Sequence, residues 1–300
     1  MIKLNLSQDF HYSKIIDSCY DSMKSTSPLK LKVLANKDAL LRVADFYEKY
    51  AKTNNLFKHN LFFLNNNDFI KIAGNTAKDL LTNYDMRELY DYFRDRRCGG
   101  FYDELINNAK NPKIKCPYCG GIGMPMELDH FLPKSKLGYY SILPYNLIPS
   151  CKDCNQSYKS TFIPENKNEQ LIHPYLDDNC FFEEQWLFAQ CHLDNDNVIH
   201  INYYVSPPNN WREDKKSKVK FHFDKFKLDK RFSIEASNNL SEITNELKHH
   251  KKKNKPISEF ISDNLDIKLE TYSHRKNHWA LALYQAIKND INILFNNLKI

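Results

Sequence analysis

Four cysteines, arranged as two pairs, constrain this chain more than any other feature of its sequence. Cys116 is followed by Cys119, and Cys151 by Cys154, with two residues inside each pair. Four thiolates at this spacing are the ligand set of a closed, tetrahedral structural Zn²⁺ site. A redox role is the weaker interpretation, because a thioredoxin-type motif has a single pair. The gap between the pairs is longer than a common zinc-finger spacing, which predicts an inserted segment.

The inserted segment has the pattern of two short strands followed by a helix. Residues 126–131 predict a strand that ends in the dipeptide Asp129-His130, and a loop containing glycine and proline follows. A second strand is expected near residues 147–148, and the polar segment 152–159 predicts a short helix. An Asp-His dipeptide alone says little about function. Between two metal-binding cysteine pairs it indicates a functional site.

Together these residues resemble an HNH endonuclease of the ββα-metal superfamily. In LDHFLPKS, His130 resembles the first histidine of the family signature, and Asn146 in PYNLIPSC resembles its middle asparagine. Asn155 in CKDCN stands where the last histidine or asparagine is found, and the cysteine pairs match the zinc-stapled branch of the family. The lead-in Arg87–Tyr90 also looks like HNH proteins of bacterial defence and restriction systems, although less specifically.

The resemblance implies a role for each residue in phosphodiester hydrolysis. A neutral His130 is suited to act as general base, since an unperturbed histidine titrates near neutral pH. Asp129 supplies a hard oxygen for Mg²⁺ or Mn²⁺, and the amide oxygen of Asn155 can add a second. Asn146 is expected to orient His130 from the loop. Adjacent residues point to opposite faces of a regular strand, so the strand end must twist for Asp129 and His130 to meet one phosphate.

Three further residues are candidates for phosphate contacts. Lys134 and Ser135 lie just past the proposed base, and Lys159 lies at the end of the predicted helix. Each of the three fits an ordinary surface residue equally well.

Residues 1–111 have mainly helical patterns. Leu40, Val43, Ala44, Tyr47, Tyr50 and Ala51 fall on one helical face. Capping boxes are expected from Thr76 to Asp79 and from Asp85 to Glu88, and Gly99-Gly100 predicts a helix stop. Four arginines make the last of these helices basic: Arg87, Arg94, Arg96 and Arg97. They suit phosphate binding, but a solvated helix face is the favoured interpretation.

The C-terminal part combines strand and helix patterns. Residues 198–205 predict a strand, and the alternation over 219–224 predicts a half-buried strand that pairs with it. Residues 230–253 look helical and end in a basic run, 248–255, which suits either a nucleic-acid backbone or a solvated linker. A last amphipathic helix, from Trp279 to Leu298, is expected to pack on the body or on a partner. A second metal site from His173, Cys180, Cys191 and His192 is weakly supported, because their spacing fits no motif.

The composition agrees with a nucleic-acid-binding protein without requiring one. The net charge is +6 and the pI is ≈ 8.7, a mild bias toward polyanions that an AT-rich genome would also produce. No apolar run approaches membrane-spanning length, and the first ten residues lack the apolar centre of a signal peptide. Eight cysteines, four of them assigned to metal, favour a reducing compartment and hence a cytoplasmic protein.

We therefore expect an α+β protein in three parts: a helical region over 1–111, a zinc-stabilised ββα-metal (HNH) core over 112–165, and an α+β region over 166–300. The expected function is metal-dependent HNH endonuclease activity on DNA, in a prokaryotic defence or restriction role beside a partner ATPase. The alternatives are a non-catalytic zinc module that binds nucleic acid or protein, and a nuclease that cleaves RNA. The sequence leaves the oligomeric state open.

Overall fold

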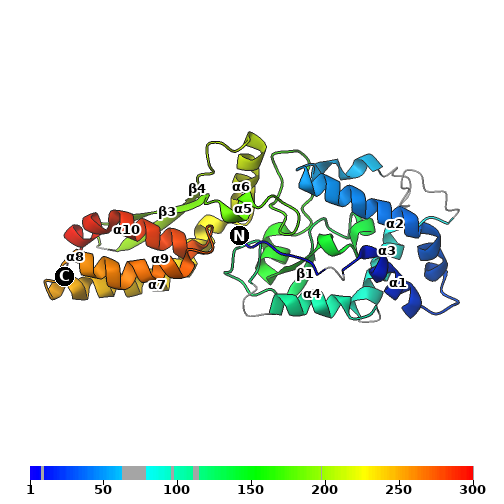
Figure 1. Cartoon of the computed structure of the whole chain (residues 1–300), viewed down its shortest axis with the longest axis horizontal. Coiled ribbons are helices and arrows are strands. Elements are labelled where there is room, and N and C mark those ends of the chain that lie inside the picture. The colour runs from blue at the N-terminus through cyan, green and yellow to red at the C-terminus, as the bar shows by residue number, and fades with distance from the viewer. Residues whose placement is uncertain (8–9, 63–78, 96–97, 111–114, 197, 300) are drawn as a thin grey trace. The chain divides into compact units, whose positions relative to one another are not determined.

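The computed structural model of the chain describes residues 1–7, 10–62, 79–95, 98–110, 115–196 and 198–299. They fold into two compact units (Figure 1). The N-terminal unit comprises Lys3–Tyr118 and Gly123–Asp178, and the C-terminal unit comprises Met1–Ile2, Cys119–Ile122 and Asn179–Ile300. Helices predominate and each unit contains one two-stranded antiparallel sheet, which confirms the α+β class. The division into three parts at 112 and 165 stays a prediction.

The N-terminal unit surrounds a small sheet with helices. Its elements are α1 Tyr12–Ser22, α2 Pro28–Lys52, η1 Leu56–Phe62, α3 Asn83–Arg94, α4 Phe101–Lys110, β1 Glu127–His130, η2 Gly138–Tyr140, η3 Pro144–Asn146, β2 Leu147–Ser150 and η4 Asp153–Lys159. Here η1, η2 and η3 are short 3₁₀ helices and η4 is a π-helix. Both predicted strands and the short helix after them are confirmed, in the order strand, strand, helix.

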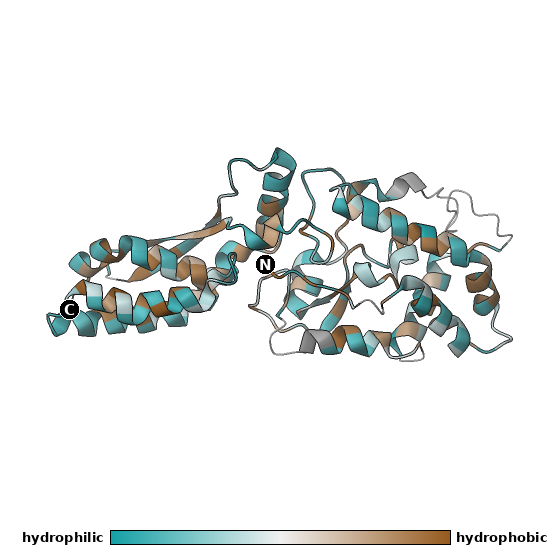
Figure 2. Cartoon of the chain, viewed as in Figure 1, coloured by the Kyte–Doolittle hydropathy of each residue, from teal (hydrophilic) through white to brown (hydrophobic). Residues whose placement is uncertain are grey.

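Helix α2 forms as its apolar pattern predicts. Leu40, Val43 and Tyr47 are fully buried, so one face of the helix lies in the core. Pro28 occupies the first turn, where its missing amide hydrogen costs no bond. Figure 2 shows this division along the helices, with hydrophobic and hydrophilic residues on different sides.

Helix α3 begins three residues earlier than the expected capping box. Its cap is Thr82, whose side chain accepts from the Asp85 amide while the Asp85 carboxylate accepts from the Thr82 amide. The expected box from Asp85 to Glu88 is therefore wrong, because Asp85 is the closing residue of the real box. Gly99 does not stop this helix, which ends at Arg94. The other expected box begins at Thr76, outside the described residues.

Two cysteines that the metal site does not use form a disulfide. Cys19 of α1 is bonded to Cys98. Disulfides are typical of oxidising compartments, so this bond is a feature that the predicted cytoplasmic location does not account for. That location stays a prediction. No helix in the described part of the chain is both long and apolar enough to cross a membrane.

The C-terminal unit packs helices against one face of a long hairpin. Its elements are α5 Cys180–Glu183, β3 Leu187–Leu193, β4 Ile199–Val205, α6 Glu213–Lys225, α7 Leu228–Lys252, α8 Ile257–Phe260, η5 Ile261–Asp266, α9 Ile267–Tyr272 and α10 Trp279–Asn297. Helix α10 packs on β3 and α7 packs on β4 (Figure 1). The predicted strand over 198–205 and the helices over 230–253 and 279–298 are confirmed, and the last helix packs on its own unit.

The strand predicted over 219–224 is wrong. Those residues belong to α6, and β4 pairs instead with β3, a strand that was not predicted. Val219 and Phe223 lie four residues apart and are both buried, as one face of a helix requires. Glu213 and Asp214 in the first turn complement the helix dipole. The same apolar residues satisfy a period of two over a short window, which explains the wrong expectation.

Candidate active site

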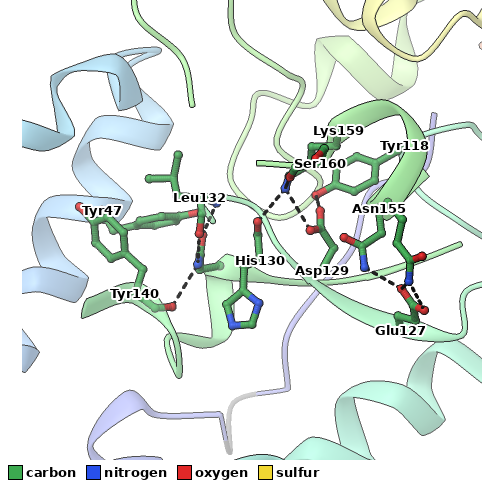
Figure 3. Close-up of polar contacts among 12 residues, drawn as sticks. Tyr47, Tyr118, Glu127, Asp129, His130, Leu132, Tyr140, Asn155, Lys159 and Ser160 are labelled. Atoms are coloured by element: carbon green, nitrogen blue, oxygen red, sulfur yellow. Dashed lines mark hydrogen bonds and ion pairs between the residues drawn. The ribbon is translucent and has the colours of Figure 1, made fainter. Parts of the chain in front are cut away.

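The candidate site forms where strand β1 ends. In the antiparallel pair, Asp129 lies opposite Ile148 and His130 opposite Leu147. Helix η4 follows β2 almost directly and carries Asn155 and Lys159 on the same side as the end of β1 (Figure 3). The order of strand, strand and helix therefore brings residues from three elements to one place.

The four paired cysteines form one buried cluster. The sulfur atoms of Cys116, Cys119, Cys151 and Cys154 all lie within 4.8 Å of one another. Zn–S bonds of about 2.3 Å in a tetrahedron place the sulfurs about 3.8 Å apart, so the donor set fits a closed zinc site. Gly123 lies against the cluster, because a Cβ there would be 2.5 Å from the Cys151 sulfur.

In the part of the chain that the structure describes, this is the only group of three or more His, Cys, Asp or Glu residues arranged to hold a metal. The weakly supported second site from His173, Cys180, Cys191 and His192 is not formed.

A pocket of ≈ 300 Å³ opens at the end of β1. Its lining residues are Tyr90, Leu128, Asp129, His130, Pro133, Lys134, Ser135, Asn155 and Ser160. The structure thus brings together five of the residues singled out from the sequence: Asp129, His130, Asn155, Lys134 and Ser135. Asn146 and Lys159 are outside this lining set.

His130 is held as a neutral imidazole with one nitrogen fixed. Its Nε2 lies 2.9 Å from the Ser141 carbonyl oxygen. Because a carbonyl only accepts, Nε2 carries the proton and Nδ1 keeps a lone pair. Burial lowers the pKa of His130 from 6.5 to about 3, and the Lys134 ammonium adds to that effect. The Tyr90 ring packs against the imidazole at 4.6 Å between ring centroids.

Asp129 points away from His130 and into a network of donors (Figure 3). Tyr118 Oη donates to Asp129 Oδ2 at 2.9 Å, and Lys159 Nζ donates to Asp129 Oδ1 at 3.0 Å. Burial raises the pKa of the Asp129 carboxyl, while Lys159 and Tyr118 act against that rise. The two adjacent side chains leave the strand in different directions, yet both line the pocket, as a twisted strand end allows.

The side chain of Asn155 is oriented by a second carboxylate. Its Nδ2 donates to Glu127 Oε2 at 2.7 Å, and Gln156 Nε2 donates to the other Glu127 oxygen at 2.9 Å. With the amide hydrogens turned to Glu127, the Asn155 oxygen is left for the pocket. This assignment of the amide follows from the hydrogen bonds, because only a donor can face a carboxylate.

Asn146 is a structural residue of the loop in this arrangement. It is fully buried, and its Oδ1 accepts from the Leu132 amide at 2.7 Å and from Tyr47 Oη at 3.0 Å. Its Nδ2 donates to the carbonyls of Leu132 and Tyr140, each at 3.0 Å. The segment just past His130 is thereby tied to the loop. The expected orientation of His130 by Asn146 is indirect, since the imidazole itself is held by Ser141.

The three candidate phosphate contacts differ in position. Ser135 is exposed and Lys134 is half-buried with its ammonium 3.7 Å from the centre of the Tyr90 ring. Lys159 is only 1% exposed. Its ammonium donates to Asp129 and, at 2.8 Å, to the His130 carbonyl. Lys159 is therefore a buried partner of the strand end, which corrects the expectation of a surface residue that meets phosphate.

Three residues of the site were not recognised in the sequence. Tyr118, Glu127 and Tyr90 hold Asp129, Asn155 and His130 respectively. A signal existed for Glu127, because alternate residues of a strand share a face and Glu127 lies two before Asp129. Tyr90 lay in the lead-in that resembles defence-system proteins.

A second hollow of ≈ 330 Å³ shares Lys134 with the pocket and is lined by Tyr84, Arg87, Glu88 and Asp91. Arg94 does not line this hollow. It forms ion pairs with Asp91 and Asp95, as arginines on solvated helix faces commonly do. Among the described arginines of this helix, Arg87 thus extends the cationic edge of the site. Arg96 and Arg97 lie outside the described residues.

The comparisons with known proteins agree with this geometry. Residues 116–161 match the family described as HNH endonuclease, so this segment of the chain holds an HNH endonuclease domain. Almost the whole chain is similar to Protein ea31 of Escherichia phage lambda, at 29% identity over 290 residues, which cover 93% of this chain and 94% of that protein. No solved structure matches the chain.

Proposed function

We propose that this protein is a metal-dependent endonuclease that hydrolyses phosphodiester bonds in DNA. One observation carries the proposal. A neutral imidazole, a carboxylate and an amide oxygen line a single pocket within the HNH domain, and the same domain holds the four-cysteine cluster. A purely structural zinc module needs none of those three groups.

In the proposed reaction, His130 takes a proton from the attacking water. Its Nδ1 is the nitrogen with a free lone pair, because Nε2 is committed to the Ser141 carbonyl. The bond to Ser141 also stops the ring from rotating, so the lone pair stays aimed. A base positioned in this way contributes typically about 10²- to 10⁴-fold to the rate.

The residues of the pocket fit a hard divalent cation. A carboxylate has about four lone-pair sites, so the two hydrogen bonds to Asp129 leave room for a metal. The Asn155 oxygen is a second hard ligand, and two protein ligands leave positions for water and phosphate, as Mg²⁺ prefers. A bound Mg²⁺ or Mn²⁺ would offset charge on the phosphate and stabilise the leaving 3′ oxygen.

The cationic edge of the pocket supports binding of a nucleic-acid backbone. Lys134 lines both hollows, Ser135 lines the first and Arg87 lines the second. Because Arg87 and Lys134 carry positive charge, they would hold the phosphates on either side of the cleaved bond. Zn²⁺ in the cysteine cluster would do no chemistry, since four thiolates leave it no open position. Its role is to hold η4 against the loop.

The deciding experiment is cleavage of supercoiled plasmid by the purified protein with Mg²⁺ or Mn²⁺, wild type beside His130→Ala. A matched single-stranded RNA substrate tests the RNA alternative in the same assay. Nicked or linear DNA from the wild type alone supports the proposal. Cleavage confined to RNA replaces DNA with RNA as substrate. Equal products from both proteins would remove His130 from the mechanism. No product from either protein would favour a non-catalytic zinc module.

The biological part of the proposal is an effector in prokaryotic defence or restriction, acting beside a partner ATPase. Its support is the resemblance of the Arg87–Tyr90 lead-in, and Tyr90 packs directly on His130. A tagged chain purified from cells that carry the neighbouring genes should bring down an ATPase. Purification of the chain alone would contradict the partnership and leave the nuclease proposal standing.

A further inference from the structure

The hairpin of the C-terminal unit carries an exposed ladder of planar side chains. On its outer face, Phe188 lies opposite Tyr204, Gln190 opposite Asn202, and His192 opposite His200. The Phe188 and Tyr204 rings are stacked at 6.1 Å between centroids, and the two imidazoles are stacked at 5.2 Å. Phe188 is half-buried and the other five residues are exposed. We call these six residues the ladder.

The opposite face of the hairpin already has its packing partners. Leu187, Cys191, Ile199, Ile201 and Tyr203 are buried there against α7 and α10. The ladder therefore lies on the solvent-facing side of the hairpin, opposite the side that forms the core. None of its six residues carries a permanent charge, which is unusual for a solvent-facing sheet in a chain that is 27% charged.

The groups in the ladder match the surfaces of unpaired bases. Aromatic and imidazole rings stack on base faces, and amides bond to base edges. Alternate residues of a strand repeat every 6.7 Å or so, so the three rungs offer successive sites along an extended strand of nucleic acid. Stacking of this kind contributes about 1–3 kcal/mol per base and needs no particular sequence.

Positive charge lies beside the rung formed by His192 and His200. A groove of ≈ 480 Å³ contains both His200 and Lys248, together with the hydroxyl groups of α7. Lys248, Lys252 and Lys253 form no ion pair within the described residues. By contrast, Lys251 donates to three carbonyls at the end of α10, and Lys255 pairs with Glu259. The basic run thus divides into residues engaged in the fold and three cations available to phosphates.

We infer that the ladder and the cations Lys248, Lys252 and Lys253 form a binding surface for single-stranded nucleic acid. The bases stack on the ladder and the backbone phosphates meet the lysines. Asp194, which accepts from His200 Nε2 at 2.6 Å, holds that imidazole in its stacked orientation. The inference concerns binding alone and holds whether or not the HNH domain cleaves.

The test measures binding of a fluorescent oligothymidylate to the full-length chain, in a His130→Ala background without added divalent metal. Phe188→Leu/Tyr204→Ala removes both rings of one rung and should weaken binding about 10- to 100-fold, by loss of stacking. Lys252→Ala/Lys253→Ala should lower the slope of log affinity against log salt by about 1.4, at about 0.7 per phosphate contact. Ile267→Ala and Lys276→Ala, exposed positions of the same unit, are the matched controls and should leave both quantities unchanged.

Photocrosslinking locates the contact independently. An oligonucleotide carrying 5-iodouracil should crosslink to peptides within residues 187–205. Unfolding curves show that each variant is folded before it is scored. Unchanged binding by the ladder variant, crosslinks confined to the HNH domain, or duplex DNA that binds as tightly as single strands would each overturn the inference. So would concentration-dependent self-association that the ladder variant abolishes, because a second copy would then be the occupant.

Discussion

Lys159 and Asp129 form an ion pair in the interior, with 3.0 Å between Nζ and Oδ1 and side-chain exposures of 0% and 4%. The pair joins the end of η4 to the end of β1, next to the residue proposed as general base. Removing one partner leaves a buried charge without compensation, which typically costs about 3–5 kcal/mol.

The first prediction follows from that pair. Lys159→Met should lower the free energy of unfolding by about 3–5 kcal/mol, because the Asp129 charge loses its counter-ion. Asp129→Asn combined with Lys159→Met should recover part of that loss. Urea unfolding of the two single variants and the double variant measures the coupling, with Lys136→Met, an exposed lysine, as control. Additive effects would show that the two side chains do not interact.

The second prediction concerns His130. His130→Ala should reduce DNA cleavage by at least about 10²- to 10⁴-fold, since the base is lost. The fold, the zinc content and DNA binding should stay close to wild type. Cleavage rates and melting temperatures measured on the same preparation separate catalysis from stability. A variant that melts early but cuts at the wild-type rate while folded would remove His130 from the mechanism.

The third prediction is a pH dependence of stability. Burial lowers the pKa of His130 to about 3 in the folded protein, against 6.5 in the unfolded chain. The unfolded state therefore binds the proton first, so the stability present above pH 6.5 is lost as pH falls toward 3. For this residue the loss between pH 7 and 5 is about 2 kcal/mol.

Urea unfolding at the two pH values should show this loss in the wild type and a smaller one in His130→Gln. His278, whose pKa burial also lowers to about 3, contributes equally to both proteins. An identical loss in the two proteins would show that His130 is not buried as a neutral group.

The fourth prediction concerns zinc. Purified protein should contain about one Zn²⁺ per chain, by the ligand count of the four-cysteine cluster. Cys151→Ser should give an unstable or insoluble product, and Gly123→Ala should do the same because its methyl group would meet the Cys151 sulfur. Cys180→Ser changes a cysteine outside the cluster and should be mild. Elemental analysis measures the zinc content, and solubility assays compare the variants. A folded protein without zinc would contradict the assignment.

The fifth prediction separates the metal ligands from the residue that orients one of them. Asp129→Ala and Asn155→Ala should abolish cleavage or weaken its dependence on Mg²⁺. Glu127→Gln should raise the Mg²⁺ concentration needed for half-maximal rate and change the maximal rate less, because it loosens the Asn155 amide. Titrations of rate against Mg²⁺ test this. Activity that persists in EDTA, after treatment mild enough to spare the zinc, would count against a catalytic cation.

The sequence predicted the centre of the site well because its signals are local. Cysteine spacing, a strand ending in Asp129-His130 and a following polar helix each occupy a few residues. What it did not predict depends on distant partners. Lys159 looks like a surface residue until the helix lays it on Asp129, and Ser141 enters only through its backbone carbonyl. Strand β3 was missed although Leu187 and Cys191 point inward while Gln190 and His192 point outward, because Ala189 and Phe188 blur the alternation.

Helix η4 closes with a hydrogen bond from the Ser160 amide to the Asn155 carbonyl, five residues back, at 2.8 Å. An α-helix closes four residues back, so this turn holds one residue more than an α-helical turn would. The extra residue sets the angle between the side chains of Asn155 and Lys159, which reach Glu127 and Asp129 of β1 respectively. The number of residues between them is therefore part of the site. Gln156, Ser157 and Tyr158 can be exchanged for other side chains more readily than any one of them can be deleted, because a deletion would turn Lys159 away from Asp129 without altering a single functional group.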